Sequence, residues 1–164
     1  MTGTDTGVGK TLIACALLQA FVAQGLAAVG MKPVACGAEP AAGALVNDDV
    51  ERLIAAGNVS APRSHVNSYC FALPIAPHIA AAKAGVTIEL DRIERSFRAL
   101  AARAQVVVVE GVGGFRVPLG ADIDTAELAA RLALPVVLVV GVRLGCLSHS
   151  LLTVESVAAR GLKL

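Results

Sequence analysis

The residues with the clearest chemical meaning lie at the start of the chain, in the glycine-rich run GTDTGVGKT at residues 3–11. This composition is typical of a phosphate-binding loop, because glycine lets backbone N–H groups approach an anion closely. Lys10 adds charge for the outer phosphates, and the Thr11 hydroxyl is a candidate magnesium ligand. The common P-loop spacing requires glycine where this chain has Thr4, so Gly3 comes one residue too early. The alternatives are a chance glycine-rich turn and a family whose loop is one residue longer.

Three further charged residues lie where predicted elements begin or end. Lys32 ends an apolar run, and Glu110 follows four valines directly. Ligands of α/β proteins gather at the carboxyl ends of strands, so these positions suit a second phosphate-neutralising lysine and a metal-binding acid. Asp49 opens a predicted helix. The plainer alternatives are a solvated lysine, an ordinary strand-end glutamate and an acid that complements the helix dipole.

These side chains are positioned by alternating strands and helices. Strands are predicted at residues 27–34, 105–110 and 135–141; the last two are β-branched runs typical of parallel strands buried on both faces. Helices are predicted at residues 11–24, 50–56, 88–103, 125–132 and 147–160. Residues 37–43 are predicted to form a loop, and residues 62–77 an irregular segment. The alternation predicts an α/β fold.

Composition limits the classes of function. The chain has 164 residues, is 55% hydrophobic and has a net charge of +1, which favours one compact domain and no nucleic-acid partner. No apolar run approaches the roughly 20 residues of a membrane helix. The four cysteines form no CxxC pair, so reduced thiols in a cytoplasm are expected. No nucleophile pattern suggests covalent catalysis, which leaves phosphoryl transfer by positioning and charge neutralisation.

Six segments taken together resemble one family in order and spacing. They are GTDTGVGKT, MKPVACGAE, NDD, APHIAA, VVVVEGVGG and LVVGVRLGCLSHS. The chain resembles the dethiobiotin synthetases over nearly its whole length, and the longer loop matches that family's GTDTxVGKT pattern. The resemblance implies a P-loop NTPase-like α/β fold, with a mostly parallel sheet flanked by helices on both faces.

The resemblance also implies a reaction. In this family ATP and Mg²⁺ drive a cyclo-ligation in which CO₂ adds to one amine of diaminopelargonic acid. ATP then phosphorylates the carbamate, and the second amine closes a cyclic urea to give dethiobiotin. The implied partners are therefore diaminopelargonic acid, CO₂ or bicarbonate, and ATP, in a homodimer that binds neither nucleic acid nor membrane.

Matched residue by residue, the resemblance assigns roles within this chain. Lys10 and Lys32 are the implied catalytic residues, and the implied metal ligands are Thr11, Asp49 and Glu110. The implied nucleotide-binding residues are Thr4, Asp5, Thr6, Gly7, Val8, Gly9, Lys10, Thr11, Asp49 and Glu110. The implied substrate-binding residues are Thr6, Lys32, Cys36, Gly111, Gly113, Gly114, Gly145, Cys146, Leu147 and Ser148, of which the last four are expected to act across the dimer interface.

The chain also departs from the family pattern. Gly7 replaces an acidic residue of some members, Arg143 stands where lysine also occurs, and Ser148 replaces an asparagine. The pattern continues beyond both ends of residues 1–164, so this single P-loop domain is expected to be incomplete at both ends. Two other functions stay open, a general P-loop ATPase and a catalytically silent nucleotide-binding domain. Partitioning ATPases are disfavoured, because Asp5 stands where they carry a second lysine.

Overall fold

A computed structural model describes residues 1–41 and 43–164 of the chain. Within these residues the chain forms eight strands and seven helices. The strands are β1 (Thr2–Gly3), β2 (Ala28–Met31), β3 (Val34–Cys36), β4 (Glu39–Ala41), β5 (Ala44–Val46), β6 (Tyr69–Phe71), β7 (Val106–Val109) and β8 (Leu138–Val139). The helices are α1 (Lys10–Ala23), α2 (Asp48–Ala56), α3 (Arg63–Val66), α4 (Pro77–Lys83), α5 (Leu90–Ala101), α6 (Thr125–Leu132) and α7 (Cys146–Ala159).

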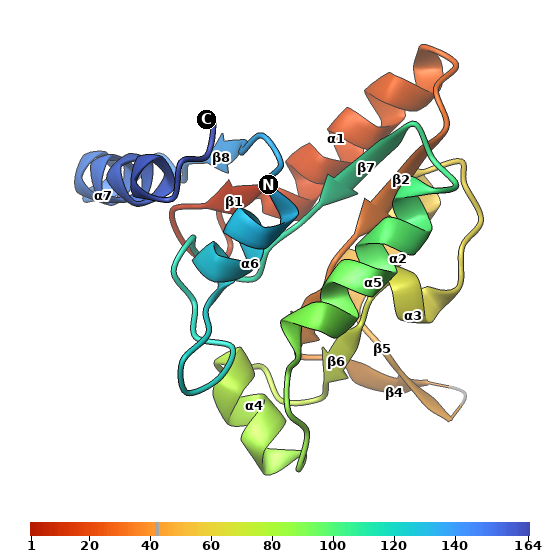
Figure 1. Cartoon of the computed structure of the whole chain (residues 1–164), viewed down its shortest axis with the longest axis horizontal. Helices are drawn as coiled ribbons and strands as arrows, with labels where there is room; N and C mark the ends of the chain where they lie inside the picture. The colour runs from red at the N-terminus through yellow and green to blue at the C-terminus, as the bar shows by residue number, and fades with distance from the viewer. Residues whose placement is uncertain (42) are drawn as a thin grey trace.

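The central strands run parallel. β1 pairs with β8, β2 with β7 and β3 with β6, and only β4 and β5, among the described strands, pair antiparallel. Hydrogen bonds at Met1 join β1 to β7, since its amino group donates to the Val109 carbonyl (2.7 Å) and its carbonyl accepts from the Gly111 N–H (3.0 Å). The strand order across the sheet is therefore β6, then β3 and β2, which follow one another along the same line, then β7, β1 and β8 (Figure 1).

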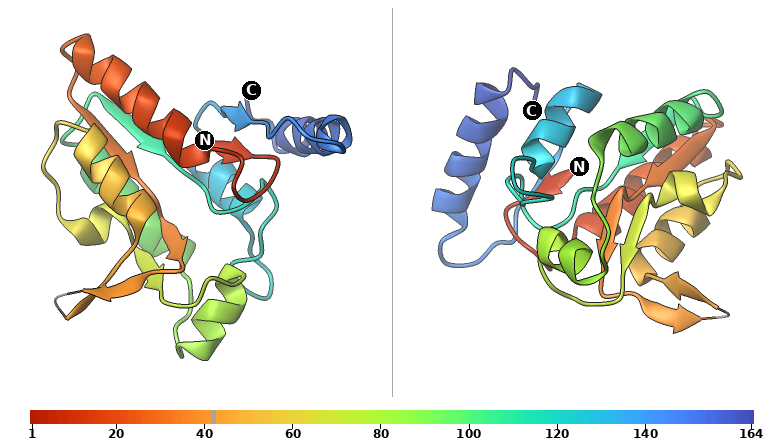
Figure 2. Two further views of the ribbon diagram at one scale, coloured as in Figure 1. Left: turned by 180° about the vertical axis from the view of Figure 1, so that it is seen from behind. Right: turned by 60° about the horizontal axis from the view of Figure 1, so that its bottom comes forward.

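Helices cover both faces of this sheet, as the front and back views show (Figures 1 and 2). Successive residues of a strand point to opposite faces, and the core follows this alternation. Ala28 and Val108 pack with α1 and α2, whereas Val29 and Met31 pack with α5 on the other face. Full burial of a Val or Met side chain stabilises the fold by roughly 1.5–3 kcal/mol. The predicted α/β class, with helices on both faces, is confirmed.

Close packing of α2 on β2 depends on one glycine. A Cβ added at Gly30 would lie 2.8 Å from the Leu53 Cβ, so the strand at this point has room only for hydrogen. This close packing places the first turn of α2 beside the carboxyl end of β2. Asn47 caps that turn by accepting hydrogen bonds from the N–H groups of Asp49 (3.2 Å) and Val50 (3.4 Å).

The predicted elements agree with the structure where their patterns are long. All five predicted helices are present, and the helix at Thr125–Leu132 has the predicted ends. The predicted loop at residues 37–43 is wrong at Glu39–Ala41, which pairs with β5; residue 42 lies outside the described residues. The predicted irregular segment at residues 62–77 is also wrong, because it contains α3 and β6. These elements are only three or four residues long, too short to show a period.

The strand predicted at residues 135–141 is shorter and less buried than expected. β8 covers only Leu138–Val139, and Val137 and Val140 are 44% and 36% exposed. One side of β8 pairs with β1, whereas on the other side the Val136 N–H donates to the Lys163 carbonyl (2.7 Å). The expectation of burial on both faces is therefore wrong for this strand. Over the described residues, none of the helices has the length and apolar character that crossing a membrane requires.

Candidate active site

The glycine-rich run forms a loop between β1 and α1. Gly7 (φ 72°) and Gly9 (φ 96°) adopt left-handed backbone conformations that other residues rarely take. Gly9 is the N-cap of α1, and in the described structure no side chain caps this helix end. Its N–H groups and its positive dipole end are thus available to an anion. Lys10 reaches back across the loop, where its Nζ donates to the Asp5 carbonyl at 2.7 Å.

The unusual spacing of the loop has a packing explanation. A Cβ added at Gly3 would lie 2.8 Å from Val8 Cγ2, and one added at Gly141 would lie 2.8 Å from Val8 Cγ1. Val8 therefore points into the protein, between β1 and the end of β8, and requires glycine on both. The Thr4 hydroxyl accepts a hydrogen bond from the Gly141 N–H (3.4 Å). Gly3 therefore allows the loop to pack closely on the sheet.

Lys32 and two acids form an ion-paired cluster beside the loop. Lys32 follows β2, Glu110 follows β7, and Asp49 lies in the first turn of α2. The Lys32 Nζ lies 2.6 Å from Glu110 Oε1 and 2.9 Å from Asp49 Oδ2. The Thr11 hydroxyl, in the first turn of α1, lies 2.8 Å from Asp49 Oδ1 and 2.9 Å from Glu110 Oε1. The four side chains come from four elements that meet at the carboxyl ends of the parallel strands.

Burial and charge set the protonation of this cluster. Glu110 is 1% exposed and Lys32 is 5% exposed, so each needs the other's charge. Burial, followed by the positive charge of Lys32, lowers the pKa of Lys10. Burial alone would raise the pKa of Asp49, but the charge and hydrogen bond of Lys32 and the hydrogen bond of Thr11 hold it below its usual value. Asp49 is therefore a carboxylate at neutral pH.

The cluster has the donor set that magnesium prefers. Two carboxylates and a hydroxyl converge, and hard oxygen ligands are what Mg²⁺ takes. Glu110 Oε2 is buried and accepts no hydrogen bond within the part of the chain that the structure describes, so one acid oxygen is free to act as a ligand. The described residues contain no group of three or more His, Cys, Asp and Glu side chains suited to a metal. A two-carboxylate site therefore fits an ion that keeps water or phosphate oxygens as its other ligands.

A cleft of about 810 Å³ joins these groups. Of the predicted site residues, it is lined by Asp5, Thr6, Gly7, Gly9, Lys10, Thr11, Lys32, Cys36, Asp49, Glu110, Gly113 and Gly114. A Cβ added at Gly113 would lie 3.6 Å from the Thr6 hydroxyl, so the glycine-rich turn after β7 lies against the phosphate loop. Burial, and then Cys70, raise the pKa of the Cys36 thiol, which keeps it neutral at physiological pH. This volume is typical of clefts that bind small-molecule ligands.

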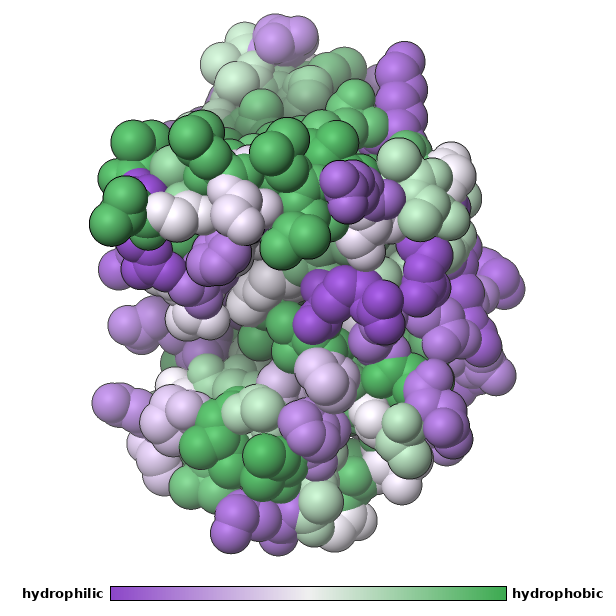
Figure 3. Space-filling model, turned by 90° about the vertical axis from the view of Figure 1, so that its left-hand side faces the viewer, coloured by the Kyte–Doolittle hydropathy of each residue, from purple (hydrophilic) through white to green (hydrophobic). Residues whose placement is uncertain are grey.

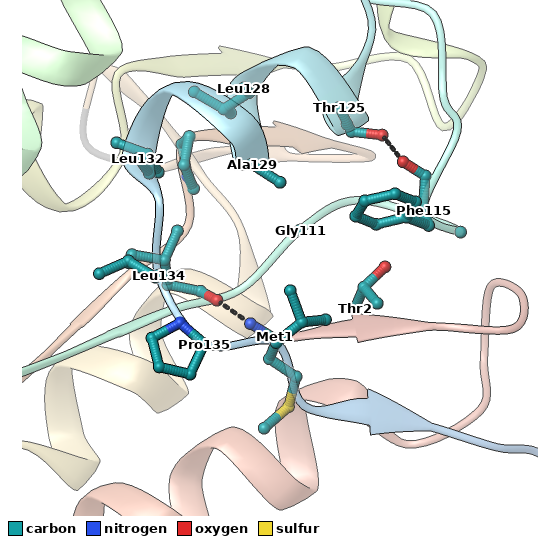
Figure 4. Close-up of a pocket in the computed structure, with 14 residues that line it drawn as sticks. Met1, Thr2, Gly111, Phe115, Thr125, Leu128, Ala129, Leu132, Leu134 and Pro135 are labelled. Carbon is teal, nitrogen blue, oxygen red and sulfur yellow. Dashed lines mark hydrogen bonds between the residues drawn. The ribbon is translucent and has the colours of Figure 1, made fainter. Parts of the chain in front are cut away.

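Seven predicted site residues lie outside this cleft: Thr4, Val8, Gly111, Gly145, Cys146, Leu147 and Ser148. Gly111 lines a separate apolar pocket of about 80 Å³ under α6, together with Met1, Phe115 and Leu128 (Figure 4). The last four lie at the start of α7, where Gly145 is the N-cap with φ 94°. α7 lies at one side of the molecule, beside α6 in the right-hand view of Figure 2, and its Val157 packs with Phe115 and Ala126. Within one chain, therefore, these four residues do not line the cleft, although His149, the next residue of α7, lines a small pocket together with Thr4 and Asp5.

The structure adds residues that sequence reasoning missed. Arg52 lines the cleft one helical turn after Asp49, and residues 74–77, with two prolines and Ile75, line it as well. The i, i+3 spacing from Asp49 was the available signal for Arg52. Asp5, at the rim, accepts the Thr6 N–H (2.7 Å) and pairs with Arg143, which precedes α7. This ion pair ties the phosphate loop to the segment that leads into α7.

Comparison with known proteins agrees with this geometry. A family model described as "AAA domain" matches residues 1–164. The chain is 58% identical to the ATP-dependent dethiobiotin synthetase BioD of Aromatoleum aromaticum (strain DSM 19018 / LMG 30748 / EbN1) over 164 residues, which cover 100% of this chain and 73% of that protein. With the phosphate loop, the strand-end lysine and the two acids in one cleft, the chain belongs to the ATP-dependent dethiobiotin synthetase family.

Proposed function

We propose that this protein is an ATP- and magnesium-dependent cyclo-ligase that converts diaminopelargonic acid and CO₂ to dethiobiotin. The observation that carries the proposal is the single cleft in which Lys10, Lys32, Asp49 and Glu110 converge. A silent nucleotide-binding domain has no need to hold a buried lysine against two acids. The 58% identity to a named dethiobiotin synthetase supports the same reaction.

The phosphate loop anchors ATP in this proposal. The N–H groups of the loop and the start of α1 hold the phosphates, and Lys10 neutralises their outer charge. Among the residues that the structure describes, the ammonium of Lys10 has only a carbonyl partner, at 2.7 Å, so it gains a full opposite charge when phosphate arrives. Thr11, Asp49 and Glu110 hold magnesium, which neutralises charge on the transferring γ-phosphoryl group when it is bound.

Lys32 and the glycine-rich turn serve the second substrate. One amine of the diamine attacks CO₂ and loses a proton, which gives a carbamate. The carbamate oxygen attacks the γ-phosphorus of ATP and ADP leaves, which gives a carbamic–phosphoric mixed anhydride. The second amine then attacks the carbonyl carbon and loses a proton to the released phosphate, which leaves with the electron pair, and a cyclic urea forms. Lys32 stabilises the developing negative charge, while Thr6, Cys36, Gly113 and Gly114 line the space for the amines.

A homodimer completes the site in this proposal. Residues 145–148 lie outside the cleft of their own chain, and the start of a 14-residue helix suits a carboxylate. The surrounding surface is apolar: Val142, Leu144, Leu147, Leu151 and Leu152 are 93%, 105%, 79%, 65% and 61% exposed. Figure 3 shows hydrophobic side chains gathered on this side of the molecule. A second copy that covers this face brings its own helix start to the neighbouring cleft.

The four free thiols suit a reducing cytoplasm.

The test is phosphate release by the purified protein with ATP, Mg²⁺ and bicarbonate, with and without diaminopelargonic acid. Release that requires the diamine, with dethiobiotin detected by mass spectrometry, is the expected result. Release that is independent of the diamine would instead indicate a general ATPase. Tight ATP binding with no release under any condition would indicate the silent domain and overturn the proposal.

A further inference from the structure

The backbone at Lys32 lies at a break in the sheet between β2 and β3. The Lys32 N–H donates to the Val66 carbonyl (2.8 Å), and the Pro33 carbonyl accepts from the Tyr69 N–H (3.0 Å). Pro33 has no N–H to donate. The N–H of Asn67 is used elsewhere, since it ends α3 by donating to the Arg63 carbonyl (2.8 Å). A regular backbone ladder therefore does not continue through this point.

The side chain of Asn67 bridges the break. Its Nδ2 donates to the Lys32 carbonyl at 2.7 Å and to the Tyr69 carbonyl at 2.9 Å, and the residue is 9% exposed. A side-chain amide has two N–H donors, so both are used here. Asn67 thereby joins the catalytic-lysine segment to β6 where the strands themselves do not pair.

The Lys32 side chain thus has two anchors of different kinds. At its tip, the ammonium is held by Glu110 and Asp49. At its base, the backbone is held by Asn67. In the proposed reaction the same two acids would hold magnesium, and the ammonium would face the reacting oxygens. The backbone anchor at Asn67 does not depend on these ion pairs.

We infer that Asn67 is a positioning residue for Lys32, which fixes the backbone from which the ammonium reaches the charge that develops on the reacting groups. The inference rests on the proposed function. Asn67 lies outside the cleft lining, and its side chain contacts Lys32 at the carbonyl. Misplacement of a reacting group by about 1 Å costs roughly a hundredfold in rate, which sets the size of the expected effect.

The test compares Asn67→Ala with a matched control, Asn58→Ala. Asn58 also makes two hydrogen bonds to backbone, since its Nδ2 donates to the Leu26 carbonyl (3.0 Å) and its Oδ1 accepts from the Ala28 N–H (2.8 Å). Its contacts are at the start of β2, whereas Lys32 follows the end of that strand. Both variants are expected to lower the thermal midpoint, because each leaves backbone groups unpaired. Only Asn67→Ala is expected to lower kcat, by about a hundredfold, with ATP affinity from calorimetry within about twofold of wild type.

A double-mutant cycle with Lys32→Ala separates positioning from general damage. If Asn67 acts through Lys32, then Asn67→Ala lowers kcat in the wild-type background but not in the Lys32→Ala background. Should Asn67→Ala fail to fold, Asn67→Ser, which keeps a hydroxyl donor, is measured instead and is expected to give an intermediate kcat. An equal fall in kcat for the Asn58 and Asn67 variants, or a full additive loss in the double variant, would overturn the inference. The proposed function is judged separately, on wild-type turnover.

Discussion

At the scale of single residues, the site places two lysines in different environments. Lys10 has a carbonyl partner and no acid within salt-bridge distance among the described residues, whereas Lys32 contacts two carboxylates. The first lysine is therefore available to an anion, whereas the second is already paired within the protein. Glu110 accepts hydrogen bonds from Lys32 and Thr11 through the same oxygen, Oε1. It therefore joins the lysine that follows β2 to the first turn of α1, which begins at Lys10.

Replacing Lys10 by methionine should separate activity from stability. Lys10→Met removes the charge that neutralises phosphate, so turnover is expected to fall by at least about a hundredfold. Burial lowers the pKa of Lys10, which means that the folded protein disfavours the ammonium form that the unfolded chain holds at neutral pH. An apolar side chain of similar length is therefore expected to keep or raise the thermal midpoint. Unchanged turnover would contradict the P-loop assignment.

Removing either acid should alter the magnesium requirement. Asp49→Asn and Glu110→Gln keep the shape of each side chain but weaken the metal ligand, so each is expected to raise the magnesium concentration for half-maximal turnover by about tenfold or more. Glu51→Gln is the matched control, because Glu51 lies on α2 but pairs with Arg63 on the surface. If turnover of both variants depends on magnesium concentration as in the wild type, neither acid is a magnesium ligand. Asp49 is then an acid that complements the helix dipole, and Glu110 is an ordinary strand-end glutamate.

At the scale of elements, the sheet gathers residues that are far apart in the chain. β2 and β7 pair in register from Ala28↔Val106 to Met31↔Val109, so the residues that follow them, Lys32 and Glu110, lie side by side. The Glu110 N–H donates to the Met31 carbonyl (2.7 Å), which extends this pairing to the site. α2 then adds Asp49 through its first turn. The cap of α2 is consequently part of how the acid is positioned.

Loss of that cap should affect both stability and metal use. Asn47→Ala removes an N-cap acceptor and the contact of its Nδ2 with the Cys36 carbonyl (3.3 Å), so the free energy of unfolding is expected to fall by about 1 kcal/mol. Asp49 lies in the released turn, so the magnesium requirement should also rise. Asp124→Ala, which uncaps α6, is the control that should lose similar stability in urea unfolding. Equal magnesium curves for the two variants would show that the cap does not position Asp49.

At the scale of the whole molecule, the exposed face of α7 should govern self-association. Leu147→Glu with Leu151→Glu places two charges on side chains that are 79% and 65% exposed. In sedimentation experiments the wild-type chain is expected to be a dimer and the double variant a monomer, because the variant cannot bury this face. Turnover should fall in parallel if the partner's helix start completes the site. Val86→Glu, at a 40% exposed apolar residue after α4, should change neither property. A wild-type monomer with full activity would contradict the dimer.

The sequence by itself determined the fold class, the long elements and the nature of the chemistry. Long periodic runs predict helices correctly, because burial of one face requires that period whatever the helix packs against. Four valines before Glu110 and the glycines around Lys10 predict a strand end and a phosphate loop for similarly local reasons. The short elements within residues 37–46 and 62–71 could not be predicted from local patterns. β6 depends on pairing with the distant strand β3, and β4 and β5 form a hairpin of three-residue strands, which are too short to show a period.

Only the tertiary structure decided which groups meet. Asp49 lies 17 residues after Lys32, and Glu110 lies 61 residues after Asp49. No local pattern shows that the three share one ion-paired cluster. The tertiary structure also placed Gly111 in a different pocket and residues 145–148 outside the cleft of their own chain, although the family resemblance had grouped all of them with the substrate. The physical reason is that parallel strands bring their carboxyl ends together regardless of separation along the chain. Contacts such as that of Asn67 with the Lys32 carbonyl follow from this assembly and leave no mark in the residues nearby.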